Sequence, residues 1–168
     1  MKQAQRYFLL KFFGILIGGF LIISFGPVER GVVIPFTSLL ARMSGAILRV
    51  IGEPVTITGT RIASPQFAVE ILNGCNGVEA MLILVASIFS FPASLAARLG
   101  GVLAGSVAIQ LLNLVRIVSL FLLGAYHRNI FDLFHSAVWQ VIIILASLGI
   151  FLFWSLKFAK RADMATSA

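Results

Sequence analysis

The stretch from Ser136 to Leu156 reads SAVWQVIIILASLGIFLFWSL and contains no charged residue. A helix of about 20 apolar residues crosses the roughly 30 Å hydrocarbon core of a bilayer, so this stretch predicts a transmembrane helix. The whole chain of 168 residues is 60% hydrophobic and 11% charged, which is too apolar for a water-soluble globule or a disordered segment. We therefore expect a membrane protein.

Three more apolar runs predict three more membrane spans. The predicted spans cover residues 8–25, 76–97, 99–122 and 136–156. Lys11 lies one turn from the start of the first run, where a long side chain can reach the lipid headgroups. No small-residue cleavage site follows this run, which favours a retained anchor over a cleaved signal peptide. The expected fold class is an all-α polytopic membrane protein with four transmembrane helices in a single domain.

The positive charges predict the orientation of the chain. The formal net charge is +7, and a surplus with so few charges overall suits the ends of membrane spans better than a nucleic-acid partner. Because cytoplasmic span ends collect Lys and Arg, we expect both termini in the cytoplasm and residues 26–74 and 124–135 outside. The residues that support this orientation are Lys2, Arg6, Lys11, Arg98, Lys157, Lys160 and Arg161. The expected location is the cell (inner) membrane, in contact with lipid.

The predicted extracytoplasmic insert, residues 26–74, shows two periodicities. Apolar residues recur at helical spacing from Val32 to Val50, with polar residues on another face. This pattern predicts an amphipathic helix that either lies in the membrane interface or packs on the helical bundle. Apolar residues then alternate with polar ones at 55–58 and again at 67–71, with a turn region between, which predicts a short β-hairpin.

The insert runs into Asn73-Gly74-Cys75-Asn76-Gly77-Val78-Glu79-Ala80. Cys75 is the single cysteine, so no disulfide within the chain is possible. Asn76 and Glu79 have the spacing of a capping box, which predicts that the second span begins at Asn76. Cys75 would then lie at the positive end of a helix, where a thiolate and an oxyanion are both favoured. A buried, unreactive cysteine is the alternative interpretation.

Two more chemically capable side chains are expected at the same membrane surface. Arg116 is the one charge inside the third span, and it lies about 27 Å along the helix from Arg98, near the outer surface. Asn113 shares its helical face and is expected to orient the guanidinium or to contact substrate. His135 precedes the fourth span, and a histidine can gain or lose a proton near neutral pH. His127 is the competing histidine.

Cys75, His135 and Arg116 supply the nucleophile, the proton shuttle and the cation that thiol acyl transfer requires. Two other interpretations remain. In the first, the chain is a non-enzymatic polytopic protein, such as a transporter subunit or an assembly scaffold, and uses Arg116 to hold an anion or to contact a helix. In the second, Cys75, His127, Asp132 and His135 bind a metal, although their irregular spacing matches no metal signature. We expect no metal and no cofactor.

The chain resembles the exosortase and archaeosortase family of membrane cysteine transpeptidases. The resemblance is carried by the Cys75 segment quoted above, by Asn113-Leu114-Val115-Arg116-Ile117, and by His135 in Phe131-Asp132-Leu133-Phe134-His135. It covers residues 69–154 approximately. The chain is most similar to the compact subgroup called exosortase H.

The resemblance implies a sorting reaction on a secreted protein. Substrates would carry a C-terminal signal made of a short motif, an apolar span and a basic tail, and the subgroup implies an IPTLxxWG-type motif. Cys75 would attack a peptide bond of the motif, His135 would protonate the leaving amine, and Arg116 would stabilise the oxyanion or the thiolate. An unidentified amine acceptor would resolve the thioester. The candidates for orienting groups or contacting substrate are Asn113, Glu79 and Asn76.

Overall fold

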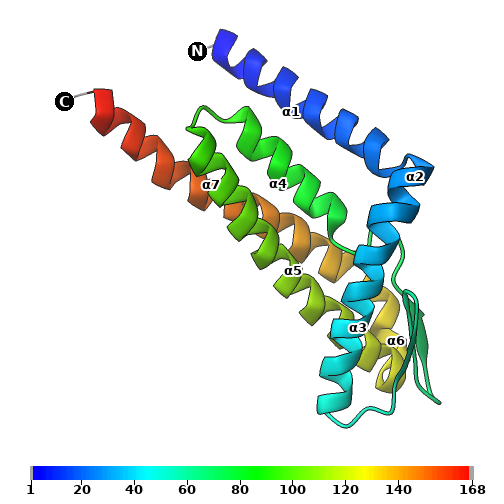
Figure 1. Ribbon diagram of the computed structural model, residues 1–168. Coiled ribbons are helices and arrows are strands. Elements are labelled where there is room, and N and C mark those ends of the chain that lie inside the picture. Colours follow the sequence, from blue (N-terminus) through cyan, green and yellow to red (C-terminus); the bar gives the residue numbers. More distant parts are fainter. Residues whose placement is uncertain (1, 167–168) are drawn as a thin grey trace.

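The computed structural model describes residues 2–166, which form long helices with a small sheet at one end (Figure 1). The helices are α1 Lys2–Ile23, α2 Gly26–Val28, α3 Ile34–Val50, α4 Val78–Ser90, α5 Leu95–Tyr126, α6 Arg128–Leu133 and α7 Trp139–Thr166. Two π-helical turns, η1 Glu29–Val33 and η2 Phe134–Val138, join α2 to α3 and α6 to α7. The strands are β1 Thr56–Thr58, β2 Arg61–Ala63 and β3 Ala68–Glu70. The side chains of Lys2, Lys160 and Arg161, which contribute to the predicted orientation, lie outside the described residues.

Among the described residues, four helical stretches are long and apolar enough to cross a membrane. They are Gln5–Ile23, Gly26–Val50, Leu95–Tyr126 and Arg128–Phe158. The predicted class, a mainly helical multi-pass membrane protein, is therefore confirmed. The first, third and fourth stretches contain most of the predicted spans 8–25, 99–122 and 136–156, whereas the predicted span 76–97 is replaced by a shorter helix.

The prediction for residues 76–97 is wrong because the helix stops at a proline. α4 has 13 residues, which rise about 20 Å and fall short of a 30 Å hydrocarbon core. Pro92 restricts the residue before it, and Phe91 accordingly leaves the helical region with φ −83° and ψ 140°. A second helix, α5, follows after Ser94, whose hydroxyl accepts a hydrogen bond of 3.3 Å from the Ala97 N–H. The uncharged run therefore belongs to two helices.

The segment predicted as an amphipathic helix is part of a continuous helix from Gly26 to Val50. One face of α3 is buried against the sheet and α5 by Thr37, Leu40, Ala41, Ser44, Gly45 and Leu48. The opposite face leaves Leu39, Met43 and Ile47 exposed. Of the two predicted placements, the structure shows packing on the bundle: α3 lies beside the end of α5 that is next to the sheet (Figure 1).

The predicted hairpin is a three-stranded antiparallel sheet with the order β1-β2-β3. The sequence predicts a turn where strand β2 lies. The chain instead reverses tightly directly after β1, which Gly59 allows with φ +61°. Thr58 then pairs with Arg61, and Ile57 pairs with Ile62. Ile62 pairs in turn with Val69 of β3. The two segments predicted to pair with each other are therefore separated by a strand that pairs with both.

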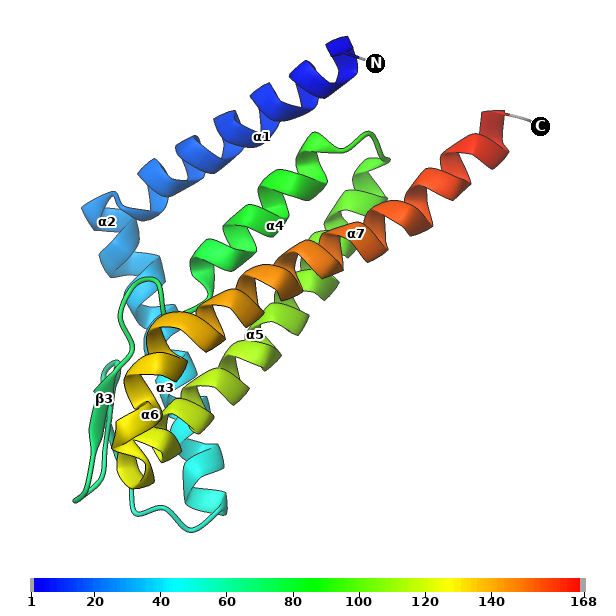
Figure 2. The ribbon, with the colours of Figure 1, turned by 180° about the vertical axis from the view of Figure 1, so that it is seen from behind.

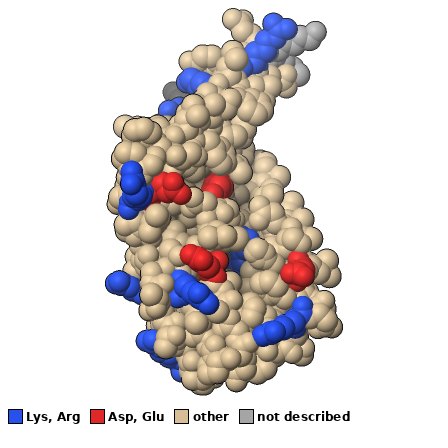
Figure 3. Space-filling model, turned by 90° about the vertical axis from the view of Figure 1, so that its right-hand side faces the viewer, with Lys and Arg blue, Asp and Glu red and all other residues tan. Residues whose placement is uncertain are grey.

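Both chain termini lie at the end of the helical bundle opposite the sheet, as the two ribbon views agree (Figures 1 and 2). On the face in Figure 3, Lys and Arg appear both at that terminal end and nearer the sheet, whereas Asp and Glu appear only nearer the sheet. This distribution is in line with the positive charges that the sequence places at both ends of the chain. Which side of the membrane the termini occupy stays a prediction.

Two apolar cores lie one after the other along the molecule. The first, next to the sheet, joins α3, the strands and the last part of α5, with Ile62 and Phe121 fully buried. The second joins α4, the first part of α5 and α7, with Leu84 and Ile109 at its centre. The loop that carries Cys75 runs between them, so the residues around it are held by packing from both sides.

Candidate active site

Cys75, Arg116 and His135 meet at one point between the sheet and the helical bundle. The Cys75 Sγ lies 3.7 Å from an Nη nitrogen of Arg116 and 3.8 Å from His135 Nε2. Arg116 is buried, with 2% of its surface exposed, and comes from α5, whereas His135 comes from the η2 turn. The structure thus brings together three side chains that are far apart in the sequence.

A small cavity lies at this meeting point. Its volume is about 30 Å³, which is room for about one water molecule. It is lined by Val69, Glu70, Ile71, Cys75, Arg116, Ile117, Leu120, Phe131 and His135. The sulfur, the guanidinium and the imidazole therefore face the same small space, next to the end of strand β3.

The loop before α4 does not form the predicted capping box. Gly77, with φ +75°, is the N-cap, and α4 begins at Val78 instead of Asn76. The Asn76 Oδ1 still accepts a hydrogen bond of 3.1 Å from the Val78 N–H. Glu79, however, accepts a hydrogen bond of 2.8 Å from the Gly74 N–H, not from Asn76. Cys75 consequently lies two residues before the cap, in a turn that the Glu79 carboxylate closes.

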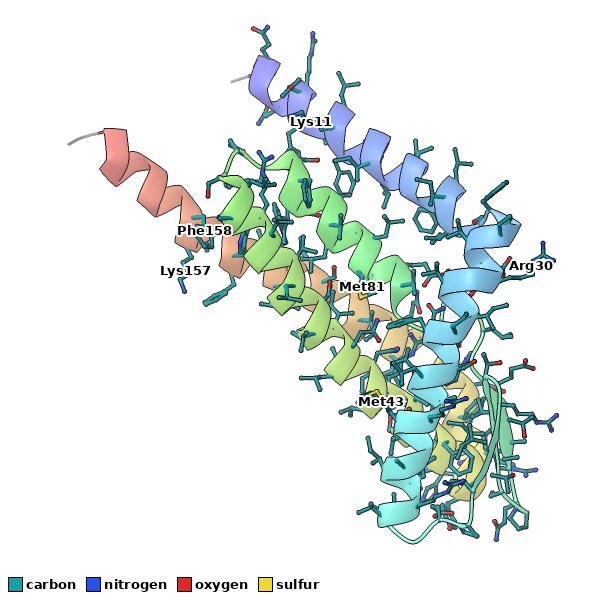
Figure 4. The ribbon with its side chains drawn as sticks, viewed as in Figure 1. Lys11, Arg30, Met43, Met81, Lys157 and Phe158 are labelled. Carbon is teal, nitrogen blue, oxygen red and sulfur yellow. The ribbon has the colours of Figure 1, made fainter. Side chains whose placement is uncertain are left out.

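Asn76 is fully buried and connects the loop to two helices. Its Nδ2 donates a hydrogen bond of 3.0 Å to the hydroxyl of Thr37 on α3. Its backbone carbonyl accepts one of 3.2 Å from Gln110 on α5. Gln110 also lies 3.4 Å from the sulfur of Met81, which sits on the first turn of α4 (Figure 4). These bonds fix the residue next to Cys75 and make Asn76 a supporting group of the site.

Asn113 supports the loop and not the guanidinium. Its amide nitrogen donates a hydrogen bond of 3.4 Å to the Gln110 side chain. Its Oδ1 is buried and has no hydrogen-bond partner among the described residues. Among these residues no hydrogen bond joins Asn113 to Arg116, so the expected orienting contact is absent in this structure. The Asn113 side chain lies instead next to the Cα of Gly77, on the side where a Cβ would project.

The contact beneath Gly77 gives a testable prediction. A Cβ added at Gly77 would lie 2.9 Å from Gln110 Nε2 and 3.2 Å from Asn113 Nδ2, in a left-handed backbone conformation. We expect Gly77→Ala to lower the melting temperature in detergent and to displace the loop. Gly74→Ala is the matched control, since Gly74 has φ +87° with nothing within 4 Å. Gly74→Ala should lower the free energy of unfolding only by the cost of the left-handed backbone, about 1–2 kcal/mol. Equal decreases in the melting temperatures of the two variants would contradict the packing argument.

The two histidines are clearly separated. His135 stacks on Phe131, with ring centroids 5.5 Å apart and an angle of 26°, and its Nε2 faces Cys75. His127 lines a different cavity of about 500 Å³, formed by the end of α5 and the start of α7. Among the described residues, no three His, Cys, Asp or Glu side chains gather where a metal could bind. The set Cys75, His127, Asp132 and His135 therefore does not surround a common point.

Four supporting residues were not predicted from the sequence. Thr37 and Gln110 hold Asn76, and Phe131 stacks on His135. Glu29 is a fourth contact, since its carboxylate accepts a hydrogen bond of 2.8 Å from Asn73 and ties the loop to the segment after α1. Polar residues inside apolar helices are a sequence signal that points to Thr37 and Gln110, but their partner emerges only in the fold.

Comparison with known proteins identifies one family. A family model described as Transmembrane exosortase (Exosortase_EpsH) matches residues 3–156. This range contains every residue of the site described above. No curated protein and no solved structure matches the chain.

Proposed function

The chain belongs to the transmembrane exosortase family, and from this membership we propose that it is a cysteine transpeptidase that cleaves the C-terminal sorting signal of secreted proteins. The single observation that carries the proposal is the position of the Cys75 sulfur within 4 Å of both a guanidinium and an imidazole. These are the groups needed to activate a thiol, to stabilise negative charge and to move a proton.

In the proposed first half-reaction, the Cys75 thiolate attacks the carbonyl carbon of a peptide bond in the sorting motif. The carbonyl oxygen becomes an oxyanion in the tetrahedral intermediate. His135 then gives a proton to the departing amine, the C–N bond breaks, and the protein remains attached to Cys75 as a thioester. The apolar span and the basic tail leave with the amine.

In the second half-reaction, an amine acceptor attacks the thioester carbonyl. His135 takes the proton that the amine loses, the C–S bond breaks, and Cys75 is regenerated as the protein leaves with a new amide bond. His135 acts as an acid in the first half and as a base in the second, because the proton that it gives to the leaving amine is replaced by the one that it takes from the acceptor. The acceptor is therefore proposed to be an amine.

Arg116 has two proposed tasks in this sequence. Its guanidinium is the cation next to the sulfur and balances a thiolate before substrate binds. After the thiolate has attacked, the negative charge moves to the carbonyl oxygen, which is bonded to the same carbon as the sulfur. A buried guanidinium stabilises charge at both positions more strongly than an exposed one, because less water screens it.

The secreted substrate is proposed to carry the IPTLxxWG-type motif, followed by an apolar span and a basic tail. A suitable probe is a secreted reporter protein with this tail, co-expressed with the chain in membranes. The apolar span would hold the reporter in the bilayer beside the enzyme, which raises its local concentration at the site. Both termini in the cytoplasm and an extracytoplasmic site complete the proposed arrangement.

The thioester itself can be tested with hydroxylamine, a small amine-type nucleophile. In the presence of hydroxylamine, the released reporter should carry a C-terminal hydroxamate, which intact-mass spectrometry distinguishes from a carboxylate. The reason is that a thioester on Cys75 is open to any nucleophile that reaches the cavity. Release of the reporter with only a free carboxylate at high hydroxylamine concentration would contradict a thioester intermediate.

A further inference from the structure

Strand β3 has one edge that pairs with no other strand among the described residues. The sheet order is β1-β2-β3, so β3 is an edge strand. Ser64 donates its N–H to the Phe67 carbonyl, and Ile71 donates its N–H to the Thr60 carbonyl. These bonds show that residues 67, 69 and 71 turn their backbone groups toward β2, because antiparallel strands alternate. Ala68 and Glu70 therefore turn their N–H and C=O groups toward the open edge.

The open edge borders the cavity of the site. Val69, Glu70 and Ile71 line the same space of about 30 Å³ as Cys75 and His135. Phe131 and His135, from α6 and the η2 turn, line the same space. Glu70, one of the two residues whose backbone groups face the open edge, therefore lies beside the cavity that Cys75 also lines.

The other end of the edge is closed. Arg128 donates a hydrogen bond to the Gln66 carbonyl, and its guanidinium lies over the Phe67 ring. Phe131 packs edge-on against the same Phe67 ring at 5.4 Å. A segment that pairs with β3 can consequently use Ala68 and Glu70 but cannot continue past Gln66, which limits it to a few residues.

The size of the site also restricts the shape of the reacting segment. A helix with its side chains is about 10–12 Å wide, much wider than a cavity that holds about one water molecule. A peptide backbone in extended form lies about 4.8 Å from a neighbouring strand. A cavity of this size holds neither a helix nor a whole extended peptide, so only the reacting carbonyl enters it. An extended backbone presents that carbonyl more readily than a helix, in which it accepts an intrahelical hydrogen bond.

We propose that the residues of the sorting motif next to the scissile bond bind as an added strand along β3, paired with the backbone groups of Ala68 and Glu70. This inference rests on the proposed function and names how its substrate is held. The backbone pairing would supply affinity without regard to side chains, and the wall formed by Phe131 and His135 would select among them. The apolar span of the signal would remain helical and begin only after the paired residues.

A proline at position 68 tests the pairing, because it removes one outward N–H. Proline is tolerated on the open side of edge strands, and the Ala68 N–H takes no part in the β2 ladder. We expect Ala68→Pro to lower kcat/KM for the tail-bearing reporter about tenfold relative to Ala68→Val, mainly through KM. Ala68→Val is the matched control, because it keeps the N–H and changes the side chain at the same exposed position. Equal kcat/KM values in the two variants would overturn the proposal, provided that Cys75 reacts with iodoacetamide at the same rate in both.

A second test locates the pairing in the substrate. Synthetic peptides that contain the motif are compared with analogues in which one amide at a time is replaced by an ester. Strand pairing predicts that loss of cleavage alternates with a period of two along the motif, since every second residue faces β3. A loss that is uniform, or absent at all positions, would contradict an added strand.

A third measurement separates this proposal from the proposed chemistry. In a Cys75→Ala chain, p-benzoylphenylalanine is incorporated at position 68 or, as a control, at position 56 on the opposite edge strand β1. The tail-bearing reporter should crosslink on irradiation at position 68 and not at position 56. Crosslinking at 68 without cleavage by the unmodified chain would leave the added strand standing and refute the transpeptidase. Cleavage by the unmodified chain with no crosslink at 68 would refute the added strand alone.

Discussion

Replacement of Cys75 by alanine is expected to leave a co-expressed, tail-bearing secreted reporter at its full, uncleaved mass. The thiolate forms the covalent bond on which both half-reactions depend, so its loss should reduce processing by about a thousandfold or more. Cys75 is half-buried and contributes to the core next to the sheet only from its edge. Alanine should therefore remove the chemistry with little change in the fold. Intact-mass spectrometry of the reporter measures the outcome.

Arg116→Gln is the useful companion to Cys75→Ala. A non-enzymatic protein that holds an anion with Arg116 would lose its function in Arg116→Gln and keep it in Cys75→Ala. The transpeptidase should lose processing in both, because the guanidinium and the sulfur act on the same reacting carbonyl. Normal processing of the reporter by the Cys75→Ala chain would end the proposed function.

Loss of the His135 imidazole is expected to produce the second largest effect. General acid–base catalysis typically contributes about 10²–10⁴-fold, and His135 Nε2 is the ring nitrogen that faces the sulfur. His135→Ala should therefore lower the rate of reporter processing by about that factor. Because the alanine leaves a space beside Phe131, added imidazole should restore part of the rate.

His127→Ala is the matched control for this histidine. Its ring lines a separate cavity with Tyr126, Phe134 and Trp139, away from Cys75. Processing by His127→Ala should stay within about twofold of the unmodified chain, in line with a substitution outside the reacting groups. If His127→Ala lost processing and His135→Ala kept it, the assignment of the proton shuttle would be reversed.

The sequence predicts the class of the protein and the meeting of three side chains because both depend on simple distances. Apolar runs of sufficient length indicate membrane helices whatever the details of packing. Arg116 could be placed near the level of Cys75 because helical rise fixes how far a residue lies along a span, and His135 because it precedes the fourth predicted span. Cys75, Arg116 and His135 are in fact neighbours in the structure.

The predictions that fail depend on local backbone choices or on tertiary contacts. Pro92 ends α4 early, although the uncharged run continues past it to Ala97. The strand Arg61–Ala63 is too short for its alternation to stand out from a turn. Asn76 donates a hydrogen bond to Thr37 and accepts one from Gln110, and these three residues come from two helices and a loop. No spacing rule within one segment can predict them.

The short helix α4 has a consequence for how the chain fits a bilayer. Asn113 lies about 27 Å along α5 from its start at Leu95, yet it contacts Gly77, which precedes α4. The last part of the path that runs antiparallel to α5 is therefore made by the non-helical peptide before α4. Non-helical backbone is tolerated at membrane depth only where it is buried in protein. Glu79 and Gln110 hydrogen-bond the backbone of this peptide at Gly74 and Asn76, and Thr37 accepts a hydrogen bond from the Asn76 side chain. The side chains that bond to this non-helical peptide are thus the same ones that hold the segment around Cys75.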